Sequence, residues 1–273
     1  MITRILVPFD GSAPARAALA YARLIASPGA TVILVYVLPV RDLLDALGVG
    51  RAAERDARAL LLEAAATFPT AQIHLPQGDP AQEIAAEGAR VGADLIILGS
   101  RGRSLLSGLV LGSTARSLLH AATVPLLVVH EPIGALTSIV AAVEAGDASV
   151  RVARSAQELA AATGARVTLV NVVDADPAVV ATPDQYGIPD QVWRDAVATH
   201  AERVFAPLRS LVPGASEALA YGRATDELPD AVKAYGAQVI VVARRGGSGI
   251  GVEAWTSVAA TLAVRGPFAT LVV

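Results

Sequence analysis

The two halves of the chain repeat each other, and this repeat limits the possible folds more than any other feature of the sequence. Residues 5–37 read ILVPFDGSAPARAALAYARLIASPGATVILVYV, and residues 139–173 read IVAAVEAGDASVRVARSAQELAAATGARVTLVNVV. Each contains a β-branched run, a turn, an Ala-rich helical pattern, a Gly turn and a second β-branched run. Further along, GADLIILGSRG at 92–102 matches GAQVIVVARRG at 236–246. A duplicated unit of about 135 residues explains these matches.

The repeat predicts two domains, one at residues 1–130 and one at residues 136–273. The segment between them contains both Pro and Gly, which is typical of a linker. A length of 273 residues agrees with two domains of about 150 residues or fewer.

The predicted strands are short, continuous apolar runs, such as ILVPF at 5–9 and LIILG at 95–99. Continuous runs are typical of parallel strands that are buried on both faces. Because these runs alternate with amphipathic helical patterns, we expect an α/β fold. Each half should form an open, doubly wound sheet of five parallel strands. Ligands of such sheets bind beyond the carboxyl ends of the strands, where the topology reverses.

Composition excludes several classes of protein. The chain is 53% hydrophobic and 17% charged, yet its apolar runs are far shorter than the ~18–20 residues of a membrane span. We see no basic and apolar leader at the N-terminus, and therefore expect a cytoplasmic protein that does not bind membranes. The absence of Cys excludes disulfides and thiolate metal sites. A net charge of −3 argues against binding to nucleic acid.

The candidate functional residues follow two strands of the first half. Asp10 comes after the first strand, and Gly99 and Gly102 come after the fourth. After nine intervening residues, Gly112-Ser113-Thr114 opens a predicted helix, whose free N–H groups and hydroxyls would suit a phosphate. Asp10 could accept hydrogen bonds from a sugar hydroxyl or a base amine. The alternative role for Asp10 is the N-cap of the helix that follows. Ser113 has the same two readings.

The spacing G-x2-G-x9-G-[ST], with an Asp closing the first strand, resembles the universal stress protein family in its tandem two-domain form. The resemblance covers the whole chain. It implies the adenine nucleotide alpha hydrolase-like strand order 3-2-1-4-5 in each half. It also implies an ATP-binding stress-response regulatory protein in which Mg²⁺ arrives with the nucleotide. From the apolar terminal strands, and not from the resemblance, we expect the two halves to form a pseudo-dimer and the chain to form a homodimer.

Carried over position by position, the resemblance implies a nucleotide site in the first domain. Pro8 and Asp10 would lie at the base and ribose, and the Val37 backbone would contact adenine. The glycine motif would hold ribose and phosphates. The implied site residues are Pro8, Asp10, Val37, Gly99, Arg101, Gly102, Gly112, Ser113 and Thr114. Arg101 and Arg103 either add charge to this site or are solvated loop residues.

The second half departs from the motif. Glu144 replaces Asp10, Ala243 replaces Gly99, and Thr256-Ser257 replaces Gly112-Ser113. We expect the Cβ atom of Ala243 to intrude where the backbone would approach a ligand. Residues 1–134 carry 11 Arg and 11 acidic residues, whereas residues 135–273 carry 11 basic and 14 acidic residues. The second pocket should therefore be empty or altered.

No catalytic grouping is apparent in the sequence. The four His residues are scattered, and no Ser/His/Asp or metal-ligand spacing occurs. We therefore expect no catalytic or metal-binding residues and at most slow ATP hydrolysis. Two alternatives remain: a nucleotide-independent scaffold or interaction protein, and a slow ATPase or autophosphorylating protein. The scaffold reading draws on the apolar strands at 126–129 and 268–273, which as sheet edges could pair with each other or with another copy. The Pro-containing stretch at 174–189 is predicted to be a surface loop.

Overall fold

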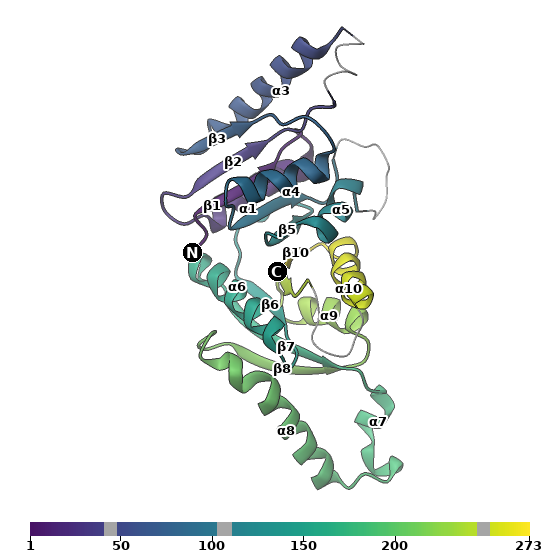
Figure 1. Ribbon diagram of the computed structural model, residues 1–273. Helices are drawn as coiled ribbons and strands as arrows, with labels where there is room; N and C mark the ends of the chain where they lie inside the picture. Colours follow the sequence, from purple (N-terminus) through teal and green to yellow (C-terminus); the bar gives the residue numbers. More distant parts are fainter. Residues whose placement is uncertain (41–47, 103–110, 245–251) are drawn as a thin grey trace. The chain divides into compact units, whose positions relative to one another are not determined.

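The chain forms two compact units in the computed structural model (Figure 1), which describes residues 1–40, 48–102, 111–244 and 252–273. Only the backbone is described at residues 177, 252–257 and 265. The first unit comprises Met1–Ala135 together with Ala269–Val272, and the second comprises Leu136–Phe268 together with Val273. No helix in the described part of the chain is long and apolar enough to cross a bilayer.

The first unit contains a parallel sheet in the predicted order, β3-β2-β1-β4-β5. Its strands are β1 (Arg4–Pro8), β2 (Thr31–Val35), β3 (Ala71–His74), β4 (Leu95–Gly99) and β5 (Leu126–Val129). The central strands are buried almost throughout, as their continuous apolar sequences predict. The predicted fold class is therefore confirmed.

Four described helices accompany this sheet: α1 (Ala13–Ile25), α3 (Gly50–Ala65), α4 (Pro80–Arg90) and α5 (Ser113–Ala121). Right-handed crossovers place α1 and α3 on one face and α4 and α5 on the other. In agreement, α4 packs against α5, whereas α1 packs over β1 and β4. The helices that follow β1 and β4 therefore begin at the same, carboxyl-terminal edge of the sheet.

The second unit repeats this arrangement with the parallel order β8-β7-β6-β9. Its strands are β6 (Ser138–Ala142), β7 (Arg166–Val173), β8 (Ser216–Tyr221) and β9 (Val239–Val242). Its α-helices are α6 (Asp147–Thr163), α7 (Pro177–Ala181), α8 (Asp190–Arg209), α9 (Ala224–Ala234) and α10 (Val252–Arg265). Gly164 ends α6 in the left-handed conformation, at φ 74°, as its position in the sequence predicts.

The stretch at 174–189 lies at the surface, as expected, but it is not entirely a loop. It contains α7 and a short 3₁₀ helix at Pro183–Tyr186. Asp176 explains the start of α7, because its carboxylate accepts a hydrogen bond from Ala178 N at 2.9 Å and a proline follows it.

The last strand, β10 (Ala269–Val272), belongs to the first unit although it ends the second repeat. It pairs antiparallel with β5, with Thr270 opposite Val128 and Val272 opposite Leu126. The predicted pairing of the two terminal strands with each other is therefore present. It gives the first unit an antiparallel strand beside its five parallel ones.

Candidate functional site

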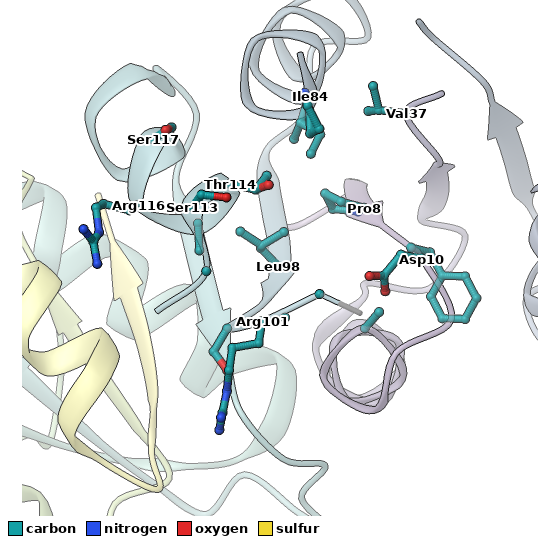
Figure 2. Close-up of a pocket in the computed structure, with 18 of the residues that line it drawn as sticks. Pro8, Asp10, Val37, Ile84, Leu98, Arg101, Ser113, Thr114, Arg116 and Ser117 are labelled. Carbon is teal, nitrogen blue, oxygen red and sulfur yellow. The ribbon is translucent and has the colours of Figure 1, made fainter. Parts of the chain in front are cut away.

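A cavity of about 660 Å³ opens at the carboxyl ends of β1, β2 and β4 (Figure 2). All nine residues that the sequence predicts for the site line it: Pro8, Asp10, Val37, Gly99, Arg101, Gly102, Gly112, Ser113 and Thr114. They come from three strand ends and one helix start, which the fold brings to one edge of the sheet. Arg103 lies outside the described residues.

Asp10 does not cap the helix that follows it, so that alternative is wrong. Its Oδ1 accepts a hydrogen bond from Ser12 N at 2.9 Å, and Ser12 is the N-cap of α1, accepting from Ala15 N at 3.3 Å. The other carboxylate oxygen lies close to Gly102, where an added Cβ would be 2.9 Å from Asp10 Oδ2. Figure 2 shows the carboxylate turned toward the middle of the cavity. The side chain of Asp10 therefore lines the cavity.

The two parts of the glycine motif lie side by side. Gly112 N donates to Ser100 O at 2.9 Å, and Ser100 N donates to Val129 O at 2.7 Å. The Ser12 hydroxyl donates to Arg101 O at 3.5 Å, which ties this loop to the start of α1. The side chain of Ser100 is buried, and among the described residues its Oγ has no hydrogen-bond partner. These hydrogen bonds hold the turn at 100–102 against Gly112.

Gly99 is required for a reason that the sequence argument did not give. A Cβ at this position would lie 2.6 Å from the carbonyl carbon of Pro14 and 2.9 Å from Ala15 N. The missing side chain therefore makes room for the first turn of α1. Close packing of α1 on β4 brings Ser12 within reach of the turn at 100–102.

At the start of α5, the first backbone N–H groups have no side-chain acceptor among the described residues. Its N-cap is Gly112, which makes no side-chain hydrogen bond, whereas Ser12 caps α1 and Asp79 caps α4. Ser113 and Thr114 are the first two helical residues, so Ser113 is not the N-cap either. The first intrahelical bond runs from Arg116 N to Gly112 O, at 3.0 Å. Three N–H groups and two hydroxyls therefore converge where the helix dipole is positive.

The end of β2 leaves backbone groups of Val37 facing the cavity. Tyr36 N donates to His74 O at 3.1 Å and Leu38 N donates to Pro76 O at 2.8 Å, both toward β3. On the other side, Phe9 N donates to Val35 O at 2.8 Å. Within the described part of the chain, the ladder stops there, and Val37 N and Phe9 O remain unpaired. Both residues line the cavity, which therefore has a backbone donor and a backbone acceptor at this edge.

Sequence reasoning missed part of the apolar wall. Pro80 and Ile84 of α4 line the cavity together with Leu98 and Leu111. Ile84 is only 3% exposed, and Figure 2 shows it near Val37. The Gly-Asp-Pro sequence at 78–80 marks a helix start, but only the crossover from β3 to β4 brings that helix over the site. Arg116 is a second cation at the cavity that the motif did not indicate.

The family model described as the universal stress protein family matches residues 1–130 and again residues 136–273. The chain belongs to the universal stress protein family. No curated protein matches it significantly.

Solved universal stress protein structures share the fold over the whole chain. A universal stress protein from Archaeoglobus fulgidus DSM 4304 is 18% identical, with a TM-score of 0.72 over 100% of this chain and 98% of the other. A candidate universal stress protein from Pseudomonas aeruginosa UCBPP-PA14 is 20% identical, with a TM-score of 0.67 over 100% and 93% of the two chains. At these identities, the likeness establishes the fold alone.

The second universal stress protein unit differs at the corresponding strand ends. The pairing of β6 with β9 places Ala243 at the position of Gly99 and Arg244 at that of Ser100. Thr256 and Ser257 do not open a helix, because α10 begins at Val252. Their equivalence to Gly112-Ser113 at a helix start is therefore wrong. Their side chains, and residues 246–251, lie outside the described residues.

Proposed function

We propose that the first unit binds an adenine nucleotide, ATP with Mg²⁺, and that the protein is a stress-response regulator. The observation that carries this proposal is the convergence of all nine predicted residues on one cavity. Its volume of about 660 Å³ is within the ~300–1,000 Å³ of typical ligand sites. The two ends of the cavity offer different chemistry, as a nucleotide requires.

The α5 end suits phosphates. Uncapped N–H groups at a helix start attract anions through hydrogen bonds and through the helix dipole. Here these N–H groups are joined by the hydroxyls of Ser113 and Thr114, with Arg116 one turn further on. The guanidinium group of Arg101 points away from Thr114 and so away from this end of the cavity (Figure 2). We therefore assign Arg101 a peripheral role.

The β2 end suits adenine. Apolar side chains from β1, β4 and α4 provide a wall for an aromatic ring, and Val37 N with Phe9 O offers one donor and one acceptor for its edge. A ribose hydroxyl would donate to the carboxylate of Asp10, which Figure 2 shows turned toward the cavity.

Mg²⁺ would enter with the nucleotide. Among the described residues no group of three or more His, Asp or Glu residues could hold a metal by itself. The Asp10 carboxylate and the two hydroxyls of α5 are the oxygen ligands that Mg²⁺ accepts in addition to phosphate oxygens. The chain's own residues thus fit a nucleotide-borne ion.

The test is release of bound nucleotide. The purified protein is denatured, the supernatant is run on ion-exchange chromatography, and the stripped protein is titrated with Mg·ATP in a calorimeter. We expect released adenine nucleotide and saturable binding. Absence of both would reject the proposal and favour a nucleotide-independent scaffold, whose oligomeric state and partner binding do not change with ATP.

We place the protein in the cytoplasm as a homodimer, with hydrolysis at most slow. A turnover assay that compares the wild type with Asp10→Ala and Ser113→Ala separates this regulator from a slow ATPase or an autophosphorylating protein. Turnover or self-phosphorylation that disappears in both variants would support the enzymatic alternative.

A further inference from the structure

The second unit contains a buried carboxamide that is bonded at both ends. Asn171 of β7 is 6% exposed, and its Nδ2 donates to Val143 O at 2.8 Å. Its Oδ1 lies 2.7 Å from Nε2 of His200 on α8. Arg203 approaches the other ring nitrogen, Nδ1, at 2.9 Å. Since an arginine can only donate, Nδ1 accepts and Nε2 carries the proton that Asn171 accepts.

The strand pairing shows where this carboxamide lies in the repeat. Val143 N donates to Val170 O at 2.8 Å, as Phe9 N donates to Val35 O in the first unit. Val143 therefore corresponds to Phe9, and Asn171 is the residue after the strand position that matches Val35. In the first unit, the matching acceptor, Phe9 O, faces the cavity and is unpaired among the described residues. In the second unit, the side chain of Asn171 donates a hydrogen bond to the matching oxygen, Val143 O.

The apolar positions around it are retained. The strand register matches Pro8, Val37 and Leu98 of the first unit with residues of the second. Ile84 is matched through the starts of α4 and α9, where a Gly precedes a Glu by the same spacing. The four matching residues are Ala142, Val172, Leu228 and Val242. All are apolar, and three of them are buried. The second unit has thus lost the phosphate motif while it keeps apolar residues at the positions of the base wall.

A carboxamide and an adenine edge have the same hydrogen-bonding pattern. Each presents an N–H donor beside an acceptor, which is why Asn pairs with adenine in two-point contacts. We infer that the Asn171 carboxamide, held by His200, occupies in the second unit the edge that the first unit leaves open for a nucleobase. The second site is then filled by the protein itself. The identity of the displaced ligand rests on the proposed function, whereas the hydrogen bonds do not.

The test uses full-length protein and adenosine, because the second unit lacks the phosphate motif. Both tryptophans, Trp193 and Trp255, lie in the second half, so Trp fluorescence follows the melting of the second unit. The first unit is saturated with Mg·ATP beforehand. We expect Asn171→Ala to lower the Trp-detected midpoint by about 5 °C. Adenosine should then raise it again by several degrees, by mass action, and should not move the wild-type midpoint.

Asn171→Leu is the matched control, because Leu has a similar size but no polar group. It should also melt early, and adenosine should not shift it. A folded Asn171→Ala protein that ignores adenosine overturns the inference, as does an equal adenosine shift in the wild type. If Asn171→Ala does not fold, Asn171→Ser carries the same test. Calorimetry with Mg·ATP on the wild-type protein tests the proposed function separately, and its failure leaves the Trp readout unaffected.

Discussion

The two units differ in the hydrogen bonding of the backbone groups at their corresponding strand ends. In the first, the start of α5 has no side-chain cap, Val37 N and Phe9 O find no partner among the described residues, and a cavity lies between them. In the second, Asn171 fills the acceptor at Val143, and Ser149 Oγ accepts from Glu144 N at 2.7 Å. The same fold therefore leaves backbone groups open at this edge in the first unit, whereas a side chain donates to the matching backbone oxygen in the second.

The largest expected effect, on Mg·ATP affinity, comes from giving α5 an N-cap side chain. In Gly112→Asp, the carboxylate would accept from the first N–H groups of α5, as Ser12 and Asp79 do for α1 and α4. It would also repel phosphate, at a cost of about 3 kcal/mol. That corresponds to about 100-fold weaker Mg·ATP binding by calorimetry.

Gly112→Ala is the control for this change. Its Cβ would lie 3.4 Å from Ser100 O at a φ of −60°, so the backbone accommodates it. Binding should weaken far less than in Gly112→Asp, and both proteins should melt near the wild type. Equal affinity in Gly112→Asp and wild type would remove α5 from the phosphate site.

The second prediction separates packing from ligand approach at the matched pair Gly99 and Ala243. Gly99→Ala would place Cβ against Pro14 and Ala15, and should destabilise the first unit by about 1–3 kcal/mol in denaturant melts followed by circular dichroism. The reverse change, Ala243→Gly, should cost the second unit less than about 1 kcal/mol and create no nucleotide binding. A fully stable Gly99→Ala protein that has merely lost ATP would restore the ligand-approach explanation.

The sequence predicts residues that a local pattern marks, and it does not predict residues that only tertiary packing brings together. The spacing of Gly102 and Gly112 and the position of Asp10 are local, and parallel topology brings strand ends together. The nine residues that line the cavity could therefore be named in advance. Ile84 could not, because only the packing of α4 brings it to the cavity. The bond between Asn171 and His200 joins β7 to α8 across residues 171–200, and no local pattern marks it. Gly99 lines the cavity as predicted, but the close packing that excludes a side chain there depends on the position of α1.

A third, smaller effect concerns β10, the strand that the first unit takes from the end of the chain. Thr270 is fully buried there, and its Oγ1 has no hydrogen-bond partner within the described residues. Replacing the hydroxyl with a methyl group of the same shape removes the desolvation penalty. Thr270→Val should therefore stabilise the protein by about 1 kcal/mol in urea melts. Thr270→Ser keeps the hydroxyl and loses the methyl, so it should be less stable than wild type; a stabilised Thr270→Ser would contradict this explanation.

The smallest expected effect is a pH dependence confined to the second unit. Burial, reinforced by the Arg203 guanidinium, holds the pKa of His200 below its ordinary value of 6.5. Between the two values the unfolded chain binds more protons than the folded one, so stability is present above about pH 6.5 and falls as the pH falls below it. The Trp-detected midpoint should therefore decline from pH 7 to pH 5, and His200→Gln, which cannot take up a proton, should flatten the decline. The lowered pKa values of Glu87 and Asp94 act on the first unit at more acidic pH, and that unit contains no Trp. An unchanged slope in His200→Gln would mean that the bond to Asn171 does not depend on a neutral imidazole, and that the second unit keeps its site filled in acid as well.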